Sequence, residues 1–421
     1  MLRIFPPVRS PGVPAVPRVV VVGGGFGGLQ CAKKLRGQPI DVVLVDRHNY
    51  HLFTPLLYQV ASCLLNPSEI AAPLRKVFRG ASNVRFRNAD VTGVDYAARA
   101  VHLADGSSLP YDHLVLAAGS RTNYFGNTRL ARSALGLKDL GEALRLRNHV
   151  LECLERAATT RDARERAWYL TFTVVGGGPT GVEYAGALAE LVRLVLPHEY
   201  PEISPAEVRI VVLEGADRLL STFPASLGDY AHRELQHLGV EVQTGRLVRD
   251  GDDVGGATLV WTAGVQASEL GGGGRIEVDE WLRVPGAPGV YAIGDLALVR
   301  DRRGQPLPMT SPPAMQQGRY VARHILTGGQ IRPFRYRDKG TLATIGRRAA
   351  VGKVGPLRFR GLLGWLVWLV VHLYYLIGFE NRLQVMLRWS WYYLRYDRPV
   401  RAIIRAANGS GMLPGTPMLD D

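Results

Sequence analysis

The stretch that decides the fold is RVVVVGGGFGG, residues 18–28, and it has a second copy, TFTVVGGGPTG, at residues 171–181. In each copy an apolar run typical of a buried parallel strand leads into Gly-x-Gly-x-x-Gly and then into a helix-like segment. The first glycine permits a tight turn, the second lets backbone approach a pyrophosphate, and the third lets helix pack on strand. Two copies therefore predict an α/β chain with two Rossmann-type dinucleotide-binding domains.

Strands and helices alternate after each copy, as a doubly wound parallel sheet requires. In the first half the pattern predicts strands at Val19–Val22, Asp41–Val45 and Leu114–Gly119 and a helix at Phe26–Arg36. In the second half it predicts strands at Phe172–Val175, Val208–Leu213 and Leu259–Gly264 and helices at Val182–Val195 and Ala231–Leu238. Because LVWTAG near residue 260 echoes LVLAAG near residue 115, the two halves follow one duplicated plan.

A carboxylate follows each fingerprint at the end of the next strand. Asp46 lies eighteen residues after Gly28, where an acidic side chain accepts hydrogen bonds from an adenosine ribose. Glu214 has the matching place in the second half, at a longer spacing because Leu196–Glu207 is expected to be an inserted loop. An acidic side chain repels a 2′-phosphate, so the second site favours NADH over NADPH, although Arg218 leaves NADPH open.

The bulk composition bounds the class of protein. A chain of 421 residues with 47% apolar side chains is long enough for two or three domains with sizeable cores. The net charge of +14 fits anionic cofactors or an anionic lipid surface. We expect no nucleic-acid partner, because the sequence has no basic tract with interleaved aromatics and no zinc-ligand spacing.

Cysteine usage and the N-terminus point to a reducing compartment. Cys31, Cys63 and Cys153 are far apart and form no C-x-x-C motif, so neither a disulfide framework nor a metal site is expected. Residues 1–17 contain five prolines and no unbroken apolar run, which predicts a flexible tail rather than a secretory signal.

The composition changes after about Lys353. Residues 361–379 carry no Asp, Glu, Lys or Arg, and this stretch of nineteen is close to the ~20 residues of a bilayer span. Arg382–Arg398 then predicts an amphipathic helix with an apolar face, arginines and several Trp and Tyr side chains. Such a basic, aromatic helix is typical of a surface-bound, monotopic segment. We therefore expect docking on an anionic lipid surface, with packing in a homodimer or core, or a true span, as alternatives.

The chain as a whole resembles the type II NADH:quinone oxidoreductases, single-subunit, non-pumping NADH dehydrogenases of the two-dinucleotide-binding-domain flavoprotein family. The resemblance runs from Val19 to about Asp397. Besides the two fingerprints it is carried by VDRHNYHLFTPLLYQVA at 45–61, PSEIAAPLR at 67–75, VVGGGPTGVEYAGALAEL at 174–191, WTAGV at 261–265, YAIGD at 291–295, RDKGTLATIGR at 337–347 and the Trp-rich C-terminal segment.

This resemblance implies an FAD-dependent enzyme that passes a hydride from NADH to the flavin and two electrons on to a membrane quinone, feeding a respiratory chain without pumping protons. It implies an FAD-binding domain made of residues 18–125 and 266–350, an NADH-binding domain over 126–265, and a membrane-associated region over 351–421. The expected location is peripheral, on the cytoplasmic side of the cell membrane.

The resemblance also assigns binding residues. The FAD would be held by Gly23, Gly25, Gly27, Gly28, Asp46, Arg47, Ala118, Gly119, Gly294 and Asp295. The NADH would be held by Gly176, Gly178, Gly181 and Glu214. Glu183 would lie near the contact of nicotinamide and flavin, although the helix dipole by itself also favours a carboxylate in a first helical turn.

The quinone motif of the family, A-Q-x-A-x-Q, is altered in this chain. The corresponding stretch is SPPAMQ at residues 311–316, so Ala314 and Gln316 match while Ser311-Pro312 replaces the leading Ala-Gln. Gln316 and the adjoining Gln317 are the expected quinone contacts. A second departure is the short connection Arg246–Thr258, where a longer hairpin is expected.

Other functions on the same fold remain to be separated. A soluble NAD(P)H-dependent flavin reductase or oxidase would need no apolar C-terminal segment, and a flavoprotein redox sensor would turn over slowly. A disulfide reductase or a sulfide:quinone oxidoreductase needs reactive cysteines beside the flavin. Cys31 falls within the first predicted helix and Cys63 stands alone, so these two activities are not expected.

Overall fold

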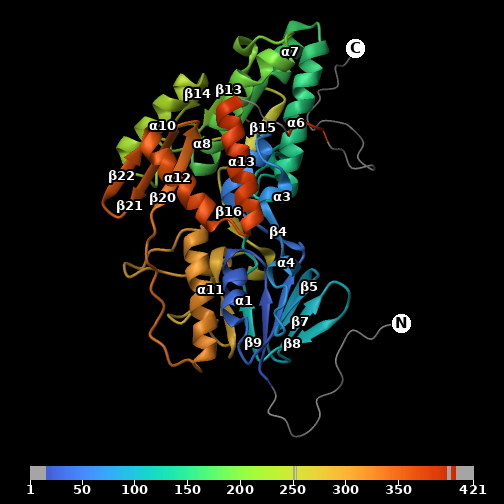
Figure 1. Ribbon diagram of the computed structural model, residues 1–421, viewed down its shortest axis with the longest axis vertical. Helices are drawn as coiled ribbons and strands as arrows, with labels where there is room; N and C mark the ends of the chain where they lie inside the picture. The colour runs from blue at the N-terminus through green and yellow to red at the C-terminus, as the bar shows by residue number, and fades with distance from the viewer. Residues whose placement is uncertain (1–15, 250–251, 253, 396–399, 404–421) are drawn as a thin grey trace. The chain divides into compact units, whose positions relative to one another are not determined.

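A computed structural model describes residues 16–249, 252, 254–395 and 400–403 (Figure 1). Contacts divide the chain into two compact units. The first contains the chain up to His51, Pro73–Ser120 and Ala267–Arg337; the second contains Leu52–Ala72, Arg121–Gln266 and the chain from Asp338 onward. The predicted N-terminal tail lies outside the described residues except for its last two, and the domain boundaries drawn from the sequence stay a prediction.

The first unit is built on a five-stranded parallel sheet in the order β18-β9-β1-β2-β5. Its strands are β1 (Arg18–Val22), β2 (Asp41–Asp46), β5 (Val84–Asn88), β9 (His113–Leu116) and β18 (Val290–Ala292). The valines of β1 are buried on both faces, as an apolar run in a central parallel strand requires. The connection from β5 to β9 forms an antiparallel sheet of β6 (Val91–Asp95), β7 (Ala100–Leu103) and β8 (Ser108–Pro110).

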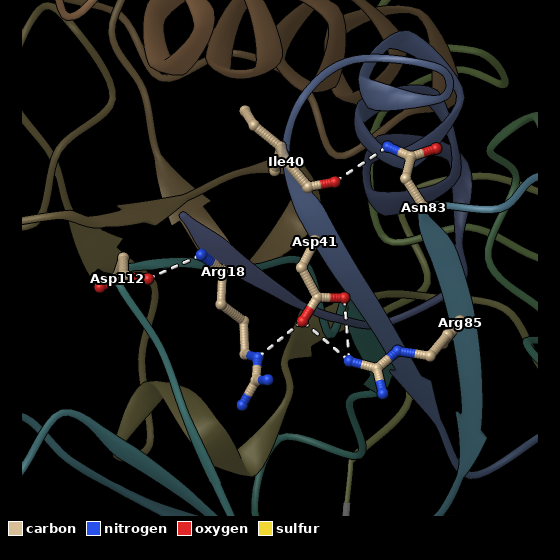
Figure 2. Close-up of polar contacts among 6 residues, drawn as sticks. All are labelled: Arg18, Ile40, Asp41, Asn83, Arg85 and Asp112. Atoms are coloured by element: carbon tan, nitrogen blue, oxygen red, sulfur yellow. Dashed lines mark hydrogen bonds and ion pairs between the residues drawn. The ribbon is translucent and has the colours of Figure 1, made fainter. Parts of the chain in front are cut away.

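Polar contacts tie the beginnings of these strands together, as Figure 2 shows. The Asp41 carboxylate accepts hydrogen bonds from Arg18 Nε at 2.8 Å and from the Arg85 guanidinium at 2.8 and 2.9 Å. The Arg18 amide donates to Asp112 at 2.7 Å, and Asn83 Nδ2 donates to the Ile40 carbonyl at 3.0 Å. These contacts link neighbouring strands at the end opposite the glycine-rich turn, so they fix the register there.

Two helices of the first unit, α1 (Phe26–Leu35) and α11 (Ser311–Leu326), lie side by side although about 280 residues separate them (Figure 1). A Cβ on Gly318 of α11 would lie 2.0 Å from the Gly27 carbonyl oxygen of α1. The helices therefore approach at backbone distance beside the first glycine-rich turn. The other short elements of this unit are α4 (Leu74–Val77), β17 (Ile276–Glu277), η3 (Glu269–Gly271), η4 (Gly294–Leu296) and β19 (Ala297–Leu298).

The second unit repeats the parallel sheet, in the order β11-β15-β12-β13-β14. Its strands are β11 (Leu135–Gly136), β12 (Thr171–Val175), β13 (Arg209–Leu213), β14 (Val240–Gln243) and β15 (Thr258–Trp261). Its helices up to Gln266 are α5 (Thr128–Ser133), α6 (Leu140–Thr159), α7 (Ala163–Tyr169), α8 (Pro179–Leu194), α9 (Leu196–Glu199), η2 (Pro205–Glu207) and α10 (Ala225–His237). All the predicted strands and helices are present, with ends that differ by up to six residues, the largest difference being the start of α10.

The connection from β14 to β15 contains no strand among its described residues, in contrast to the three-stranded connection of the first unit. The segment Leu52–Ala72 belongs to the second unit, although the residues before and after it belong to the first. It forms η1 (Thr54–Leu56), α2 (Leu57–Ala61) and α3 (Pro67–Ile70). The short strands β3 (Tyr50–Leu52), β4 (Ala71–Pro73), β10 (Ser120–Thr122) and β16 (Val265–Ala267) lie where the chain passes from one unit to the other.

The C-terminal part of the second unit forms an antiparallel sheet followed by two helices. The sheet contains β20 (Thr341–Gly346), β21 (Ala349–Val354) and β22 (Leu357–Arg360), and the helices are α12 (Gly361–Tyr375) and α13 (Phe379–Arg395). The uncharged stretch 361–379 thus forms α12 and the short connection after it, and it ends at the first residue of α13. Over the residues that the structure describes, none of the helices is long and apolar enough to cross a bilayer.

Gly186 of α8 gives a test of this packing. A Cβ there would lie 1.9 Å from the Ile345 carbonyl oxygen of β20, so Gly186→Ala forces the helix away from the sheet. We expect a loss of about 1–3 kcal/mol in the free energy of unfolding, measured by thermal and urea denaturation. Gly93→Ala is the matched control, because a Cβ at that β6 position has no neighbour within 4 Å. Equal midpoints for the two variants would contradict the close approach.

Candidate functional site

The first glycine-rich turn, between β1 and α1, is shaped by contacts that only glycine permits. Gly23 has φ +107°, and a Cβ there would lie 2.3 Å from the Ala117 carbonyl oxygen. A Cβ on Gly28 would lie 1.9 Å from the Gly23 carbonyl oxygen. A Cβ on Gly25, in contrast, would have no heavy atom within 4 Å, so open space remains at the N-terminus of α1. This is the form of a cradle for the pyrophosphate of a dinucleotide.

The turn between β12 and α8 in the second unit has the same geometry. Gly176 has φ +108°, and a Cβ on Gly181 would lie 1.9 Å from the Gly176 carbonyl oxygen. A Cβ on Gly178 would again have no heavy atom within 4 Å. The two fingerprints therefore form two equivalent cradles, each in its own unit.

A carboxylate closes each cradle by accepting a hydrogen bond from the middle glycine of the Gly-Gly-Gly run, which is Gly24 in the first cradle and Gly177 in the second. Asp46 Oδ2 accepts from the Gly24 amide at 2.5 Å, and Glu214 Oε2 accepts from the Gly177 amide at 2.5 Å. The second oxygen of each carboxylate also accepts from backbone, at 2.7 Å from the His48 and Ala216 amides. Burial raises the pKa of Asp46, and the hydrogen bonds from Gly24 and His48 oppose that rise. The carboxylates thus stabilise the turn, and they also stand where a ribose is expected to bind.

Gly294 and Asp295 form a second group beside the first cradle. Gln317 Oε1 accepts from the Gly294 amide at 2.6 Å, and the Asp295 carboxylate accepts from the Ser120 hydroxyl at 2.5 Å. Gly27 of α1 faces the residue before this group and the start of α11, because a Cβ on it would be 3.1 Å from Ile293 Cδ1 and 3.3 Å from the Ala314 carbonyl oxygen. The first unit therefore brings Gly27, the Gly-Asp pair and the start of α11 together.

The remaining FAD-site candidates take different places. The Ala118 amide nitrogen is 3.1 Å from the position of a Cβ on Gly23, so it lines the back of the turn. Gly119 has φ +69°, and its carbonyl accepts from the Ser268 amide at 3.1 Å. Arg47 Nε pairs with Asp90 at 3.1 Å, and both side chains are more than half exposed, so this guanidinium lies on the surface.

Both predicted quinone contacts bind backbone. Gln317 is 1% exposed and holds Gly294, while Gln316 bonds Arg337 twice, with Nε2 donating to its carbonyl at 2.9 Å and Oε1 accepting from its amide at 3.0 Å. Pro312 and Pro313 occupy the first turn of α11, where a missing N–H is tolerated. The direct contact of either glutamine with a quinone stays a prediction.

Glu183, in the second turn of α8, is a buried carboxyl group. Burial raises its pKa from 4.5 to about 8, and the Thr344 amide, which donates to Oε1 at 3.3 Å, and the Trp368 indole oppose the rise. Trp368 is itself 1% exposed and stacks on His372 with ring centroids 4.3 Å apart. The carboxyl group is therefore protonated near neutral pH. These neighbours come from β20 and α12, more than 150 residues away in the sequence.

Sequence reasoning missed the partners that hold these candidates. Ser120 donates to Asp295 and directly follows the predicted strand Leu114–Gly119. Its position next to the FAD-site candidate Gly119 was the one sequence signal that could have indicated it. Thr344 lies within RDKGTLATIGR, but nothing in the sequence places this segment beside Glu183. Cys31, Cys63 and Cys153 are buried, and none of them forms a disulfide in the described part of the chain. The described residues contain no cluster of side chains suited to a metal ion.

Comparison with known proteins defines the class to which these cradles belong. Residues 17–318 match the family of pyridine nucleotide-disulphide oxidoreductases. Over 408 residues the chain is 41% identical to the type II NADH:quinone oxidoreductase Ndh of Mycobacterium tuberculosis (strain ATCC 25618 / H37Rv), covering 89% of this chain and 87% of that protein. It is 38% identical to NdhA, a second type II NADH:quinone oxidoreductase of that organism, over 89% and 86% of the two chains.

The fold agrees with a solved structure as well. The structure of NDH2 from Plasmodium falciparum in complex with NADH superposes with a TM-score of 0.86, covering 93% of this chain and all of that chain at 21% identity. The chain belongs to the type II NADH:quinone oxidoreductases. The family and the fold class indicated by the sequence are therefore confirmed.

The elevated pKa of Glu183 gives a test of its environment. In the unfolded chain this group ionises near 4.5, while in the folded protein it keeps its proton up to about 8. The wild type therefore loses stability relative to Glu183→Gln as the pH rises through this window. We expect the melting temperature of Glu183→Gln minus that of the wild type to increase from pH 5 to 8.

Below pH 4.5 both states of the wild type are protonated, so the same difference should be constant there and serves as the internal control. A difference that stays flat between pH 5 and 8 would mean that Glu183 is ionised in the folded protein.

Proposed function

We propose that this protein carries out the reaction of its family, in which NADH is oxidised and a quinone is reduced with FAD as the bound redox group and without proton pumping. The observation that carries the proposal is the pair of matched glycine cradles, each with an open position at a helix N-terminus and a carboxylate at the end of the next strand. Two dinucleotides in one chain are what an electron relay from NADH to flavin requires.

The residues of the first unit fit FAD. The open position at Gly25 and the N-terminus of α1 suit a pyrophosphate, because the helix dipole and free amides favour negative charge there. Asp46 stands at the strand end where the ribose is expected, and the Gly294-Asp295 pair, held by Gln317 and Ser120, adds a second polar edge. When bound, FAD supplies the two-electron step between NADH and quinone.

The residues of the second unit fit NADH. Gly178 leaves the open position for its pyrophosphate, and Glu214 stands at the strand end where the adenosine ribose is expected and where a carboxylate disfavours a 2′-phosphate. The protein's part in hydride transfer is to orient the nicotinamide and to exclude water, because the chemistry belongs to the cofactors. Glu183, protonated near neutral pH, holds a proton in a buried place within the second unit.

The altered quinone motif points to an indirect role for its glutamines. Since the amides of Gln316 and Gln317 are used to hold Arg337 and Gly294, we propose that they shape the backbone where the FAD and quinone sites adjoin. This role explains why the leading Ala-Gln can be replaced by Ser311-Pro312, which begins α11. Quinone binding then depends on the position of this backbone more than on an amide in direct contact.

Among their described residues, the C-terminal helices expose nine large apolar side chains, which we call the apolar face. It contains Leu362, Leu363, Leu366, Val370, Tyr374, Leu383, Met386, Leu387 and Trp391, each more than 40% exposed. The other side of the helix pair is fixed within the second unit: Trp389 Nε1 donates to Gln59 at 2.9 Å, and Arg388 pairs with Glu69 at 2.8 Å. The pair is thus anchored inward while its apolar face is left outward.

We propose that the apolar face docks on an anionic membrane surface. Exposed apolar patches of this kind mark membrane or protein interfaces. The exposed aromatic rings of Tyr374 and Trp391 and the exposed Arg358 and Arg360 just before α12 favour a membrane interface. A quinone with a long apolar tail stays in the lipid, so docking brings the enzyme to its acceptor. NADH is available in the cytoplasm, which places the proposed docking on the cytoplasmic side, and a homodimer through the same face is the competing arrangement.

The reaction is tested by steady-state kinetics on the protein purified in detergent. We expect a yellow, FAD-containing protein that oxidises NADH with a short-chain soluble quinone at about 1 per second or faster, the usual range of enzyme turnover. The absorbance of the bound flavin should fall with NADH and return with quinone. A redox sensor would show the bleaching with negligible turnover, and a soluble oxidase would turn over with oxygen but gain nothing from quinone.

Docking is tested with the double variant Leu363→Glu/Val370→Glu, whose positions are 59% and 69% exposed on α12. Each lost apolar contact with lipid is worth about 1.5–3 kcal/mol, so binding to vesicles with anionic lipid should fall at least tenfold. NADH oxidation with a soluble dye should be unchanged. Tyr96→Glu, at an exposed position of the first unit, is the matched control and should bind vesicles like the wild type. A dimer that becomes a monomer, with vesicle binding unaltered, would favour the homodimer instead.

A further inference from the structure

The middle glycine of the first cradle is held on both sides by side chains. The Gly24 amide donates to Asp46 Oδ2 at 2.5 Å, and the Gly24 carbonyl accepts from His51 Nδ1 at 2.9 Å. His51 is 1% exposed and meets the ring of Phe26, the first residue of α1, edge to face with centroids 4.9 Å apart. Sequence reasoning gave His51 no role, although it lies in the segment that follows Asp46.

The hydrogen bond defines the protonation of the imidazole. A carbonyl oxygen can only accept, so the proton must be on Nδ1. Burial lowers the pKa of His51 to about 4, which leaves the ring neutral at pH 7. Nε2 then carries a lone pair and has no hydrogen-bond partner among the described residues. His51 is therefore a neutral hydrogen-bond donor to the Gly24 carbonyl, and this contact is not a salt bridge.

The second cradle shows what this contact replaces. There the Gly177 amide donates to Glu214 Oε2, and the Gly177 carbonyl accepts from the backbone amide of Leu220 at 2.8 Å. Leu220 follows Glu214 by six residues, and His51 follows Asp46 by five. The loop after each carboxylate thus supplies a donor to the corresponding carbonyl, through a side chain in the first cradle and through backbone in the second.

Fixing this carbonyl has a consequence for the next peptide group. In a planar trans peptide the C=O and the following N–H point in opposite directions, so the Gly24 carbonyl and the Gly25 amide are oriented together. Because His51 holds the carbonyl, the Gly25 amide points away from His51. Gly25 is the position where a Cβ would have no neighbour within 4 Å, which is the open part of the cradle.

We propose that His51 is a positioning residue for FAD: its Nδ1–H holds the Gly24–Gly25 peptide in the orientation that presents the Gly25 amide to the FAD pyrophosphate. The inference rests on the proposed binding of FAD by the first cradle. The two cradles then differ in how this carbonyl is held. A substitution of His51 can release the Gly24 carbonyl, while the Gly177 carbonyl stays held by the Leu220 backbone amide.

The test compares the FAD-loaded wild type with His51→Leu and His51→Asn. Leucine fills a similar volume without a donor, while the asparagine amide can place an N–H near the position of Nδ1. We expect FAD to dissociate about tenfold faster from His51→Leu, the effect of one buried hydrogen bond. The ³¹P resonances of the bound pyrophosphate should shift in this variant. Both the release rate and the resonances should return towards wild-type values in His51→Asn.

NADH affinity serves as the control and should be unchanged in both variants, because Leu220 holds the second cradle. If His51→Leu fails to fold, His51→Gln, whose amide reaches the place of Nε2 instead, takes its part and should show the same loss. Wild-type release and ³¹P spectra in His51→Leu, or no recovery in a folded His51→Asn, would overturn the proposal. A wild type that contains no FAD would instead refute the proposed function itself.

Discussion

The contact on which both units depend is the approach of a helix to the strand before it at backbone distance. A Cβ on the third glycine of either fingerprint would lie 1.9 Å from the carbonyl oxygen of the first glycine, in both Gly28 against Gly23 and Gly181 against Gly176. No side chain fits in that space, so the turn closes only with glycine. The closure aims the helix N-terminus, with its unpaired amides and partial positive charge, at the open position of the cradle.

Several polar side chains around the cradles hold backbone in place. Asp46 and Glu214 bind the amides of the middle glycines, and Gln317 binds the amide of Gly294. A flavoenzyme leaves the chemical step to its cofactors, so the protein contributes position and electrostatics. Residues of this kind act by fixing peptide orientation, and substitutions at them are expected to alter cofactor affinity before they alter the chemical step.

Two regions depart from the duplicated plan: the connection between β14 and β15, and the C-terminal part of the chain. The connection between β14 and β15 has no strand among its described residues, whereas the corresponding connection of the first unit forms β6, β7 and β8. In the C-terminal part, Trp368 and Trp389 pack inward with ring centroids 5.5 Å apart, while Val370 and Leu387 stay exposed. An inward aromatic anchor and an outward apolar face suit a segment that contacts both protein and lipid.

The sequence by itself determined the two cradles, their strands and helices, and the carboxylates at the strand ends, because each of these depends on local spacing and on the steric freedom of glycine. It could not reveal that Thr344 lies beside Glu183, or that the side-chain amides of Gln316 and Gln317 hydrogen-bond backbone groups, since these contacts join segments apart in the sequence. Only the tertiary structure decided them, because burial and hydrogen-bond partners arise when separate elements pack. The pKa of Glu183 is raised by burial in that packing, and no residue near Glu183 in the sequence causes the shift.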